Sequence, residues 1–280
     1  MSTIRWLGED DCHHEALVGG KAASLSRLAS RHPVPHGFAI SAIAAAEHTL
    51  VDGLLPAIEH AYHRLGERCG TTHPPVAVRS SALDEDGLDA SFAGQHDTYL
   101  NIRGVDAVLN AIRRCVMSAT SREALAYRQQ RGLCADGVQM AVLVQQFVPS
   151  DVSAVVFSAN PVSGSRDELM INSNWGLGES IVSGTAMPDT FVVRKQGLEV
   201  AWRDIAQKDR MTVPTETGTA ERDVPPQLRA VPSLTEAQVR DVAQLALTLE
   251  GSVGRPVDVE CAIARDTLYL LQCRPITTLD

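Results

Sequence analysis

The end of the sequence contains two runs, 256–263 and 267–274, in which apolar and polar residues alternate as in a β-hairpin. Polar side chains occupy the even positions, at Asp258, Glu260, Gln272 and Arg274. Because successive side chains of a strand point to opposite faces, all four can share one face. A three-residue turn at 265–267 places Glu260 opposite Gln272. The same register places Asp258 opposite Arg274, whereas a two-residue turn would mix the polar and apolar sets, so the pattern favours the longer turn.

This register has consequences for both faces of the hairpin. The second face is apolar and is expected in a core; it carries Val257, Val259, Cys261, Ile263, Tyr269, Leu271 and Cys273. Directly opposed side chains have Cβ atoms about 5 Å apart, so two carboxylates, an amide and a guanidinium converge on the polar face. Carboxylate and amide oxygens suit Mg²⁺, and a guanidinium suits phosphate oxygens. The alternative is an edge hairpin with a surface salt bridge between Asp258 and Arg274.

Composition and charge narrow the class of protein. With 280 residues, 44% of them hydrophobic, the chain can bury a substantial core as one large domain or two lobes. The net charge of −9 argues against nucleic acid or an anionic membrane as partners. No hydrophobic signal segment opens the sequence and no apolar run approaches the roughly 18 residues needed to span a bilayer, so we expect a cytoplasmic protein. The cysteines lack C-x-x-C spacing, which predicts free thiols.

The hydrophobic period changes near Gly137, which predicts two parts, 1–137 and 138–280. Helical spacing dominates the first part, and the second contains five strand-like runs, at 138–148, 152–158, 169–172, 190–193 and 198–202. The Pro-rich stretch 210–232 is expected to be an exposed connection. After it, Ser233 and Glu236 have capping-box spacing at the start of a helix that Gly251 is expected to end.

Two segments of the first part could contact phosphate. Two glycines precede Lys21 and a run with helical spacing, and a lysine at a glycine-opened helix N-terminus can hold phosphate. Gly94 lies in a turn of small residues that permits close approach of the backbone to a ligand, and Thr98 adds a hydroxyl. Each segment also has a plain structural interpretation, as an amphipathic helix and as a hairpin loop.

Several motifs occur together and in order along the chain. They are Gly-Gly-Lys21-Ala-Ala-Ser-Leu, Val-Pro-His-Gly-Phe, Val-Arg79-Ser-Ser-Ala, Ser-Phe-Ala-Gly94-Gln-His-Asp-Thr98-Tyr-Leu-Asn, Trp-Gly-Leu-Gly-Glu179, Pro-Asp189-Thr and Gln272-Cys-Arg274-Pro-Ile-Thr. Any one of these motifs is weak evidence for a family, but the whole set in this order is specific. From about Val18 to Thr277 the sequence resembles the N-terminal nucleotide-binding domain shared by phosphoenolpyruvate synthase, pyruvate phosphate dikinase and rifampicin phosphotransferase.

The resemblance implies an α+β fold of the ATP-grasp-like kind. ATP would lie in the cleft between a mixed N-terminal lobe, 1–137, and a β-rich C-terminal lobe, 138–280. The catalytic residues implied by it, which would bind the ATP phosphates, are Lys21, Arg79 and Arg274. Glu260 and Gln272 would hold Mg²⁺ or Mn²⁺. The phosphate-covering loop and the adenine pocket would add Gly94, Gln95, His96, Asp97, Thr98, Gln145, Gln146, Phe147 and Val148.

The activity implied by the resemblance is ATP-dependent phosphotransfer of the dikinase type. ATP phosphorylates a histidine on a swivelling domain and becomes AMP and phosphate, and the group is carried on to pyruvate or a drug. This sequence contains no Thr-x-x-x-x-Ser-His-Ala segment of the kind that carries such a histidine, so we expect the histidine on another domain or a partner protein. The alternatives are a stand-alone ATP-grasp kinase or ligase acting on a small molecule, and a nucleotide-binding regulatory subunit without turnover.

Overall fold

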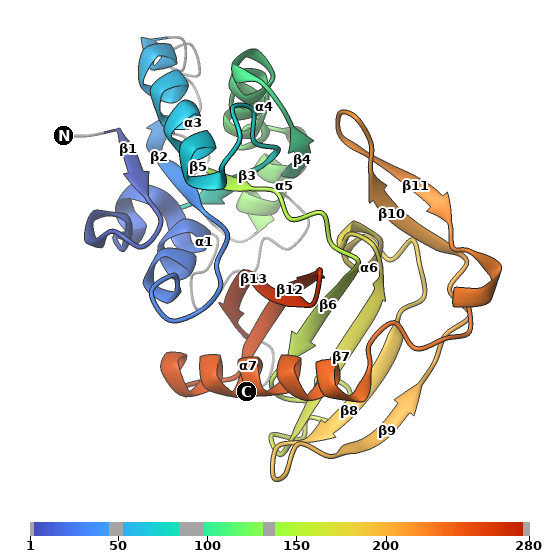
Figure 1. The fold of residues 1–280 in the computed structure, drawn as a ribbon. Helices are drawn as coiled ribbons and strands as arrows, with labels where there is room; N and C mark the ends of the chain where they lie inside the picture. The colour runs from blue at the N-terminus through green and yellow to red at the C-terminus, as the bar shows by residue number, and fades with distance from the viewer. Residues whose placement is uncertain (1–2, 45–52, 84–97, 131–137, 277–280) are drawn as a thin grey trace. The chain divides into compact units, whose positions relative to one another are not determined.

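The structure is a computed structural model that describes residues 3–44, 53–83, 98–130 and 138–276 (Figure 1). The chain divides into two compact units. The first comprises Met1–Phe147 with Glu216–Gly218, and the second comprises Val148–Thr215 with Thr219–Asp280. Each unit combines helices with a β-sheet, so the expected α+β class is confirmed.

The first unit is built on a five-stranded antiparallel sheet in the order β1-β2-β5-β3-β4. Its strands are β1 (Ile4–Trp6), β2 (Gly37–Ala44), β3 (Val76–Ala82), β4 (Thr98–Ile102) and β5 (Gln139–Gln146). The change of period placed 138–148 at the start of the second part, but β5 pairs with β2 and β3 inside this sheet. The assignment of 1–137 and 138–280 to two nucleotide-binding lobes stays a prediction.

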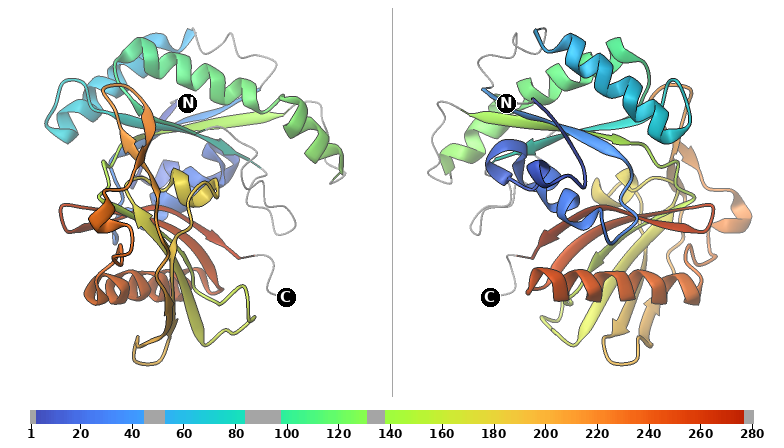
Figure 2. Two further views of the ribbon diagram at one scale, coloured as in Figure 1. Left: turned by 90° about the vertical axis from the view of Figure 1, so that its right-hand side faces the viewer. Right: turned by 60° about the vertical axis from the view of Figure 1, so that its left-hand side comes forward.

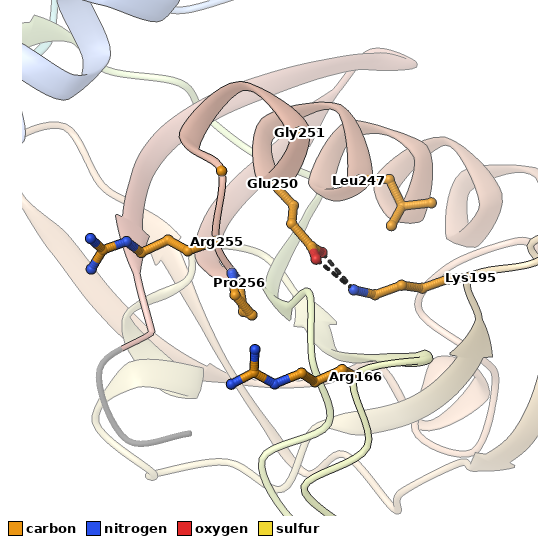
Figure 3. Close-up of a pocket in the computed structure, with 8 residues that line it drawn as sticks. Arg166, Lys195, Leu247, Glu250, Gly251, Arg255 and Pro256 are labelled. Carbon is orange, nitrogen blue, oxygen red and sulfur yellow. Dashed lines mark hydrogen bonds and ion pairs between the residues drawn. The ribbon is translucent and has the colours of Figure 1, made fainter. Parts of the chain in front are cut away.

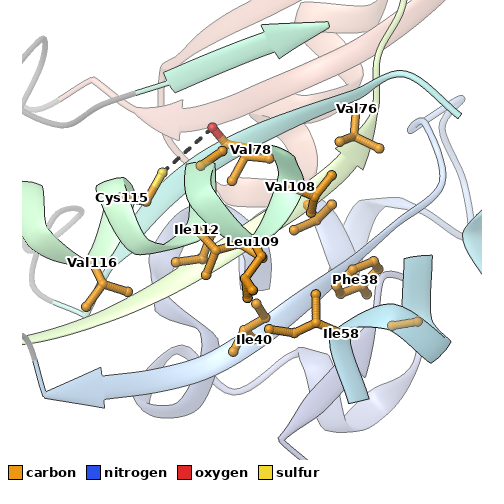
Figure 4. Packing of buried hydrophobic residues seen from close by; sticks show 14 of the residues in the cluster. Phe38, Ile40, Ile58, Val76, Val78, Val108, Leu109, Ile112, Cys115 and Val116 are labelled. Carbon is orange, nitrogen blue, oxygen red and sulfur yellow. Dashed lines mark hydrogen bonds between the residues drawn. The ribbon is translucent and has the colours of Figure 1, made fainter. Parts of the chain in front are cut away.

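Helices cover both faces of the first sheet. They are α1 (Glu15–Leu28), α3 (Leu55–Cys69), α4 (Val105–Ser118) and α5 (Arg122–Gln130), with a short 3₁₀ helix at Asp10–Cys12. The main core lies between the sheet and helices α3 and α4, where Ile58 and Ile112 pack with Phe38 and Val78 (Figure 4). These strand residues are at even positions. The odd-numbered residues of β3 face α1, because the Ser81 side chain hydrogen bonds to that helix.

The second unit contains a six-stranded antiparallel sheet in the order β13-β12-β6-β7-β8-β9. The strands are β6 (Val152–Phe157), β7 (Glu168–Trp175), β8 (Asp189–Arg194), β9 (Val200–Asp204), β12 (Val257–Ala264) and β13 (Thr267–Pro275). Helix α7 (Glu236–Val253) lies along this sheet and contacts β12 and β6 (Figure 2). A short helix, α6 (Glu179–Val182), follows β7.

Two local predictions for the second unit need correction. The stretch 210–232 contains an antiparallel hairpin of β10 (Arg210–Pro214) and β11 (Thr219–Asp223), followed by a 3₁₀ helix at Pro226–Leu228. The N-cap of α7 is Thr235, which forms a capping box with Gln238. Ser233 is buried instead and binds Asp189. The helix continues past Gly251 to Val253, because the left-handed cap residue is Gly254, with a φ of 78°.

Candidate functional site

The polar end of the terminal hairpin has the register that the sequence predicts. Glu260 lies opposite Gln272, and Asp258 lies opposite Arg274. Opposed residues of antiparallel strands point to the same face, so the four polar side chains share one face of β12 and β13. On the other face of these strands, Val257, Val259 and Cys273 are buried. The predicted convergence of the four polar side chains is confirmed.

The turn of the hairpin differs from the prediction. Ala264 lies opposite Thr267, so the turn consists of only two residues, Arg265 and Asp266. Both have positive φ values, 48° and 62°, as two-residue hairpin turns with two left-handed positions require. The register shifts after Glu260, where Gln272 and Leu270 are the successive partners of Glu260 and Cys261. Leu271 is the extra residue of this β-bulge. The two-residue turn alone would place Leu271 opposite Glu260, and the bulge shifts the register by one residue so that Gln272 lies there instead.

The bulge changes which apolar residues share the polar face. Tyr269 lies opposite Ala262, and Leu270 takes the position opposite Cys261. The prediction that Tyr269 shares the face of Cys261 is therefore wrong. Val148, Ala262 and Ala264 form a small buried cluster against which Tyr269 and Leu271 pack. One face of the hairpin is thus polar at the open end and apolar near the turn.

A charged contact joins the two strands at the polar end. Oδ2 of Asp258 accepts hydrogen bonds from Nε and Nη2 of Arg274, at 2.8 and 2.6 Å. The Asp258 side chain is 9% exposed and that of Arg274 is 29% exposed. Burial raises the pKa of the Asp258 carboxyl, the Arg274 guanidinium opposes this rise, and the charge of Glu260 adds to it. As the alternative interpretation expects, β13 is an edge strand and Asp258 pairs with Arg274, but the Asp258 carboxylate is mostly buried.

The oxygen donors of this patch fit Mg²⁺ bound together with a phosphorylated ligand. Glu260 and Gln272 present a carboxylate and an amide on adjacent strands. Oδ1 of Asp258 is buried and has no hydrogen-bond partner in the described part of the chain. No three His, Cys, Asp or Glu residues among those described gather into a group that could hold a metal ion. Mg²⁺ commonly takes one or two protein carboxylates and completes its shell with substrate phosphates and water.

In the first unit, Gly19 divides α1 into two helical parts. Its φ of 73° and ψ of 167° lie outside the helical region. A Cβ at this position would lie 2.1 Å from the carbonyl oxygen of Ser81, so only glycine fits against β3. The Ser81 hydroxyl donates to the carbonyl oxygen of Val18 at 2.7 Å and accepts from the backbone N–H of Ala22 at 3.2 Å. The helical run predicted from Lys21, after the two glycines, is present, but α1 also includes helical residues before Gly19, from Glu15.

This junction between α1 and β3 brings together the predicted phosphate-binding residues of the first unit. Nζ of Lys21 donates to the carbonyl oxygen of Ser80, at 3.2 Å. Arg79 is the preceding residue of β3, and it lies opposite Thr98 of β4. Arg79 points to the sheet face covered by α1, because it is two residues before Ser81 on the same strand. Lys21, Arg79 and Thr98 therefore come from three elements that meet at residues 79 and 80 of β3.

The predicted adenine segment lies at the end of β5 and just beyond it. Gln145 is buried, and its Nε2 donates to the carbonyl oxygen of Pro35 at 3.4 Å. The backbone N–H of Gln146 donates to the carbonyl oxygen of His36 at 2.7 Å. Val148 belongs to the second unit. The predicted phosphate-covering loop, Gly94, Gln95, His96 and Asp97, lies outside the described residues.

A cavity of about 470 Å³ lies in the second unit at the C-terminal end of α7 (Figure 3). It is lined by Arg166, Lys195, Leu247, Glu250, Gly251, Gly254, Arg255 and Pro256. Both carboxylate oxygens of Glu250 accept hydrogen bonds from Nζ of Lys195 at 2.7 Å. The residues predicted to bind ATP do not line this cavity, so we place the candidate site on the hairpin face and at the α1–β3 junction, each within its own unit.

A buried polar network in the second unit had no predicted role. Asp189 and Lys208 form an ion pair at 2.5 Å with both side chains fully buried. Asp189 also accepts hydrogen bonds from the backbone N–H of Ala206 and from the backbone and hydroxyl of Ser233. The Pro-Asp189-Thr motif was the signal in the sequence. The partners could not be found there, because they lie 17 to 44 residues away in the chain.

Within the described ranges, no helix combines the length and the apolar character needed to cross a membrane. The cytoplasmic location expected from the sequence stays a prediction.

Residues 44–280 match the family described as pyruvate phosphate dikinase, AMP/ATP-binding domain. The chain is 36% identical over 320 aligned positions to a probable phosphoenolpyruvate synthase of Methanocaldococcus jannaschii, with 100% of this chain and 27% of the relative covered. It is 42% identical over 234 positions to a rifampicin phosphotransferase of Streptomyces sviceus, with 83% and 26% covered. The chain thus spans about a quarter of the length of these relatives.

Among solved structures, the chain is similar to a dinucleotide-forming acetyl-coenzyme A synthetase of Ca. Korarchaeum cryptofilum. The sequence identity is 12%, the TM-score is 0.44, and 91% of each chain is covered.

Proposed function

Because this chain belongs to the pyruvate phosphate dikinase AMP/ATP-binding domain family, we propose that it is an ATP-dependent phosphotransferase domain or subunit of the dikinase type. It binds Mg–ATP and transfers one phosphoryl group to a histidine nitrogen on a separate domain or partner protein. Water accepts the other phosphoryl group as inorganic phosphate, so ATP becomes AMP and phosphate. The final acceptor is a small molecule such as pyruvate or a drug, as the names of the relatives suggest. The observation that carries the proposal is the pairing of Glu260 with Gln272 and of Asp258 with Arg274 on one hairpin face.

The two units contribute different groups to this proposal. Lys21 and Arg79 bind phosphate oxygens, supported by the contact of Lys21 with Ser80, the residue that follows Arg79 on β3. The loop 94–97 and Thr98 cover the phosphates, and Gln145, Gln146 and Val148 line the adenine pocket. Arg274 reaches the terminal phosphates. The arrangement of these groups around one ATP molecule, in an ATP-grasp-like cleft, is part of the proposal.

The chemistry required of these residues is charge neutralisation and positioning. Phosphoryl transfer passes through a state with negative charge spread over the transferring oxygens, and fixed cationic groups stabilise that charge. Mg²⁺, held by Glu260 and Gln272, would supply further neutralisation of the phosphate oxygens when bound. Lys21 offers a point charge, whereas Arg79 and Arg274 offer planar groups that can hold two oxygens at once. The protein's own residues therefore orient the phosphates for attack by an imidazole nitrogen.

Calorimetric titration with ATP, in Mg²⁺ and in excess chelator, tests the proposal. The affinity for ATP should be much higher with Mg²⁺ or Mn²⁺ than in chelator, because the Glu260 carboxylate repels the negative charge of a metal-free triphosphate. Glu260→Ala should abolish this metal dependence and any turnover while keeping the fold. Glu199→Ala, which removes an exposed carboxylate between β8 and β9, should behave like the wild type. Equal ATP affinity with and without chelator in the wild type would contradict the proposal.

A further inference from the structure

Among the described residues, Asp258 makes side-chain hydrogen bonds to one, Arg274. Two nitrogens of Arg274, Nε and Nη2, donate to the same oxygen, Oδ2, at 2.8 and 2.6 Å. Both nitrogens belong to one edge of the planar guanidinium, so the contact fixes the direction of that plane as well as its position. The residues lie directly opposite each other across β12 and β13, which sets the spacing of the two backbones.

The burial of the pair separates it from an ordinary surface ion pair. The Asp258 side chain is 9% exposed, whereas the Arg274 side chain is 29% exposed and keeps part of its surface in solvent. The second oxygen of Asp258 is buried without a hydrogen-bond partner in the described part of the chain. Burying a charged oxygen without a hydrogen bond lowers the stability of the fold. Backbone hydrogen bonds already pair β12 with β13, so joining the two strands does not explain a carboxylate at this position.

The position of the pair links it to the candidate site. Asp258 lies two residues before Glu260 on β12, and Arg274 lies two residues after Gln272 on β13. All four side chains therefore lie on one face in two adjacent rows. An arginine that must meet phosphate oxygens with a planar group loses rotamer freedom on binding, and a second contact that already holds the plane reduces this loss.

We propose that Asp258 is a positioning residue that holds the Arg274 guanidinium in the orientation in which it binds the terminal phosphates of ATP. The inference rests on the proposed function, because it assumes that Arg274 contacts those phosphates. In this role Asp258 acts on the nucleotide only through Arg274. Its effect is confined to nucleotides that have terminal phosphates, which distinguishes positioning of Arg274 from a general role in stability.

The test compares the binding of ATP and of AMP, both with Mg²⁺, by calorimetry. Asp258→Asn keeps the shape of the side chain and removes its charge. We expect the affinity for ATP to fall by about tenfold, because the Arg274 guanidinium is no longer held in its binding orientation. The affinity for AMP should change by less than about twofold. Asp258→Ser is the second variant, and thermal unfolding identifies which of the two keeps the wild-type fold.

A double-mutant cycle shows whether Asp258 acts through Arg274. Arg274→Ala should weaken ATP binding, and adding Asp258→Asn to it should have no further effect, because a positioning residue has nothing left to hold. The matched control is Asp223→Asn. Asp223 forms an exposed ion pair with Arg210 on the β10–β11 hairpin, in which Oδ1 of Asp223 lies 2.7 Å from Nη1 of Arg210. Breaking this pair should leave the affinities for ATP and for AMP unchanged.

Three results would overturn the inference. ATP and AMP affinities falling together would mean that Asp258 only stabilises the unit. Additive effects of the two substitutions would mean that Asp258 acts independently of Arg274. Unchanged or tighter ATP binding by Asp258→Asn, with weaker binding by Arg274→Ala, would mean that the orientation of Arg274 does not depend on Asp258. If the wild type does not bind ATP, the proposed function itself fails, which is a different result from these three.

Discussion

Gly19 is the residue whose conformation most directly sets the α1–β3 junction. Its φ of 73° is unfavourable for other residues, and a Cβ there would lie within 2.5 Å of three Ser81 atoms. Two of these atoms belong to the Ser81 backbone, so the clash cannot be relieved by turning a side chain. The two glycines before Lys21 predict a turn. The contact of Gly19 with Ser81 could not be predicted from the local pattern, because the two residues are 62 positions apart in the sequence.

We predict that Gly19→Ala lowers the free energy of unfolding by about 2–5 kcal/mol, from backbone strain and overpacking together. Urea unfolding measures the change. Gly251→Ala is the control, because Gly251 lies in α7 with open space around its Cβ position and no positive φ. That substitution should be neutral or stabilising by up to about 1 kcal/mol. A Gly19→Ala protein as stable as the wild type would show that α1 can move away from β3.

Cys12 gives a prediction for the dependence of stability on pH. The side chain is fully buried, and burial raises the pKa of its thiol from 9.0 to about 11. Between these two values the unfolded chain loses the proton while the folded chain keeps it, so the folded state becomes less stable as pH rises from 9 to 11. The expected loss from this group is about 2–3 kcal/mol.

Comparing the wild type with Cys12→Ala isolates this contribution. The substitution costs some packing energy at every pH, but it removes the titrating group. The difference in unfolding free energy between the two proteins should therefore shrink between about pH 8 and about pH 11 by the amount expected from the thiol. If the two pH profiles stay parallel, the Cys12 thiol is not held neutral in the folded state.

The terminal hairpin shows how far a pattern of alternation can predict a structure. Alternation found both strands and the opposition of Glu260 to Gln272, because a polar side chain displaced by one residue would enter the core. It could not find the bulge. Two-residue turns with positive φ at both positions are usually marked by Asn-Gly or Asp-Gly, and Arg265-Asp266 has neither glycine nor asparagine. The turn residues therefore gave no signal that the loop is one residue shorter than predicted.

Two single-residue deletions in β13 test the role of the bulge. Deleting Leu271 removes the extra residue and leaves Gln272 opposite Glu260, so Mg–ATP binding should persist with a modest loss of stability from the packing of Leu271. Deleting Cys273 should bring Arg274 opposite Val259, on the apolar face, and abolish Mg–ATP binding. Calorimetry and thermal unfolding of both variants give the comparison. Equal Mg–ATP binding by the two proteins would exclude this account of the register.

The Asp189–Lys208 pair predicts a strong effect of removing one partner only. Asp189→Asn leaves the Lys208 ammonium in a fully buried position without its counter-charge. We expect a loss of about 3–5 kcal/mol in unfolding free energy, measured in urea. Adding Lys208→Met should recover part of this loss, because it removes the uncompensated charge. A small effect of Asp189→Asn alone would show that water or another group compensates Lys208.

For the chain as a whole, the ordered motifs carried more information than any one segment. They indicated the family and the α+β class, which the family match over 44–280 and the structure bear out. They also indicated that the resemblance includes the segment before residue 44, which the alignment of the whole chain to the Methanocaldococcus jannaschii relative supports. Composition and periodicity alone would have left β5 with the wrong sheet, because its apolar residues do not specify which strands it pairs with. The hydrogen-bond partners of Asp189 are also far from it in the sequence, so only the tertiary packing determines them.

The last prediction concerns the path of the phosphoryl group. Because the sequence contains no segment of the type that carries the swivelling histidine, this chain with Mg–ATP should consume ATP only slowly, by transfer to water. Addition of a histidine-bearing domain from the same family should accelerate AMP formation and place an acid-labile phosphate on that domain. ATP labelled at the β or the γ position, followed by separation of nucleotide, phosphate and protein, measures both effects. A dikinase-type step gives AMP and phosphate, whereas a stand-alone kinase or ligase gives ADP. Rapid stoichiometric phosphorylation of a small molecule by this chain alone would therefore replace the dikinase-type proposal with a direct kinase.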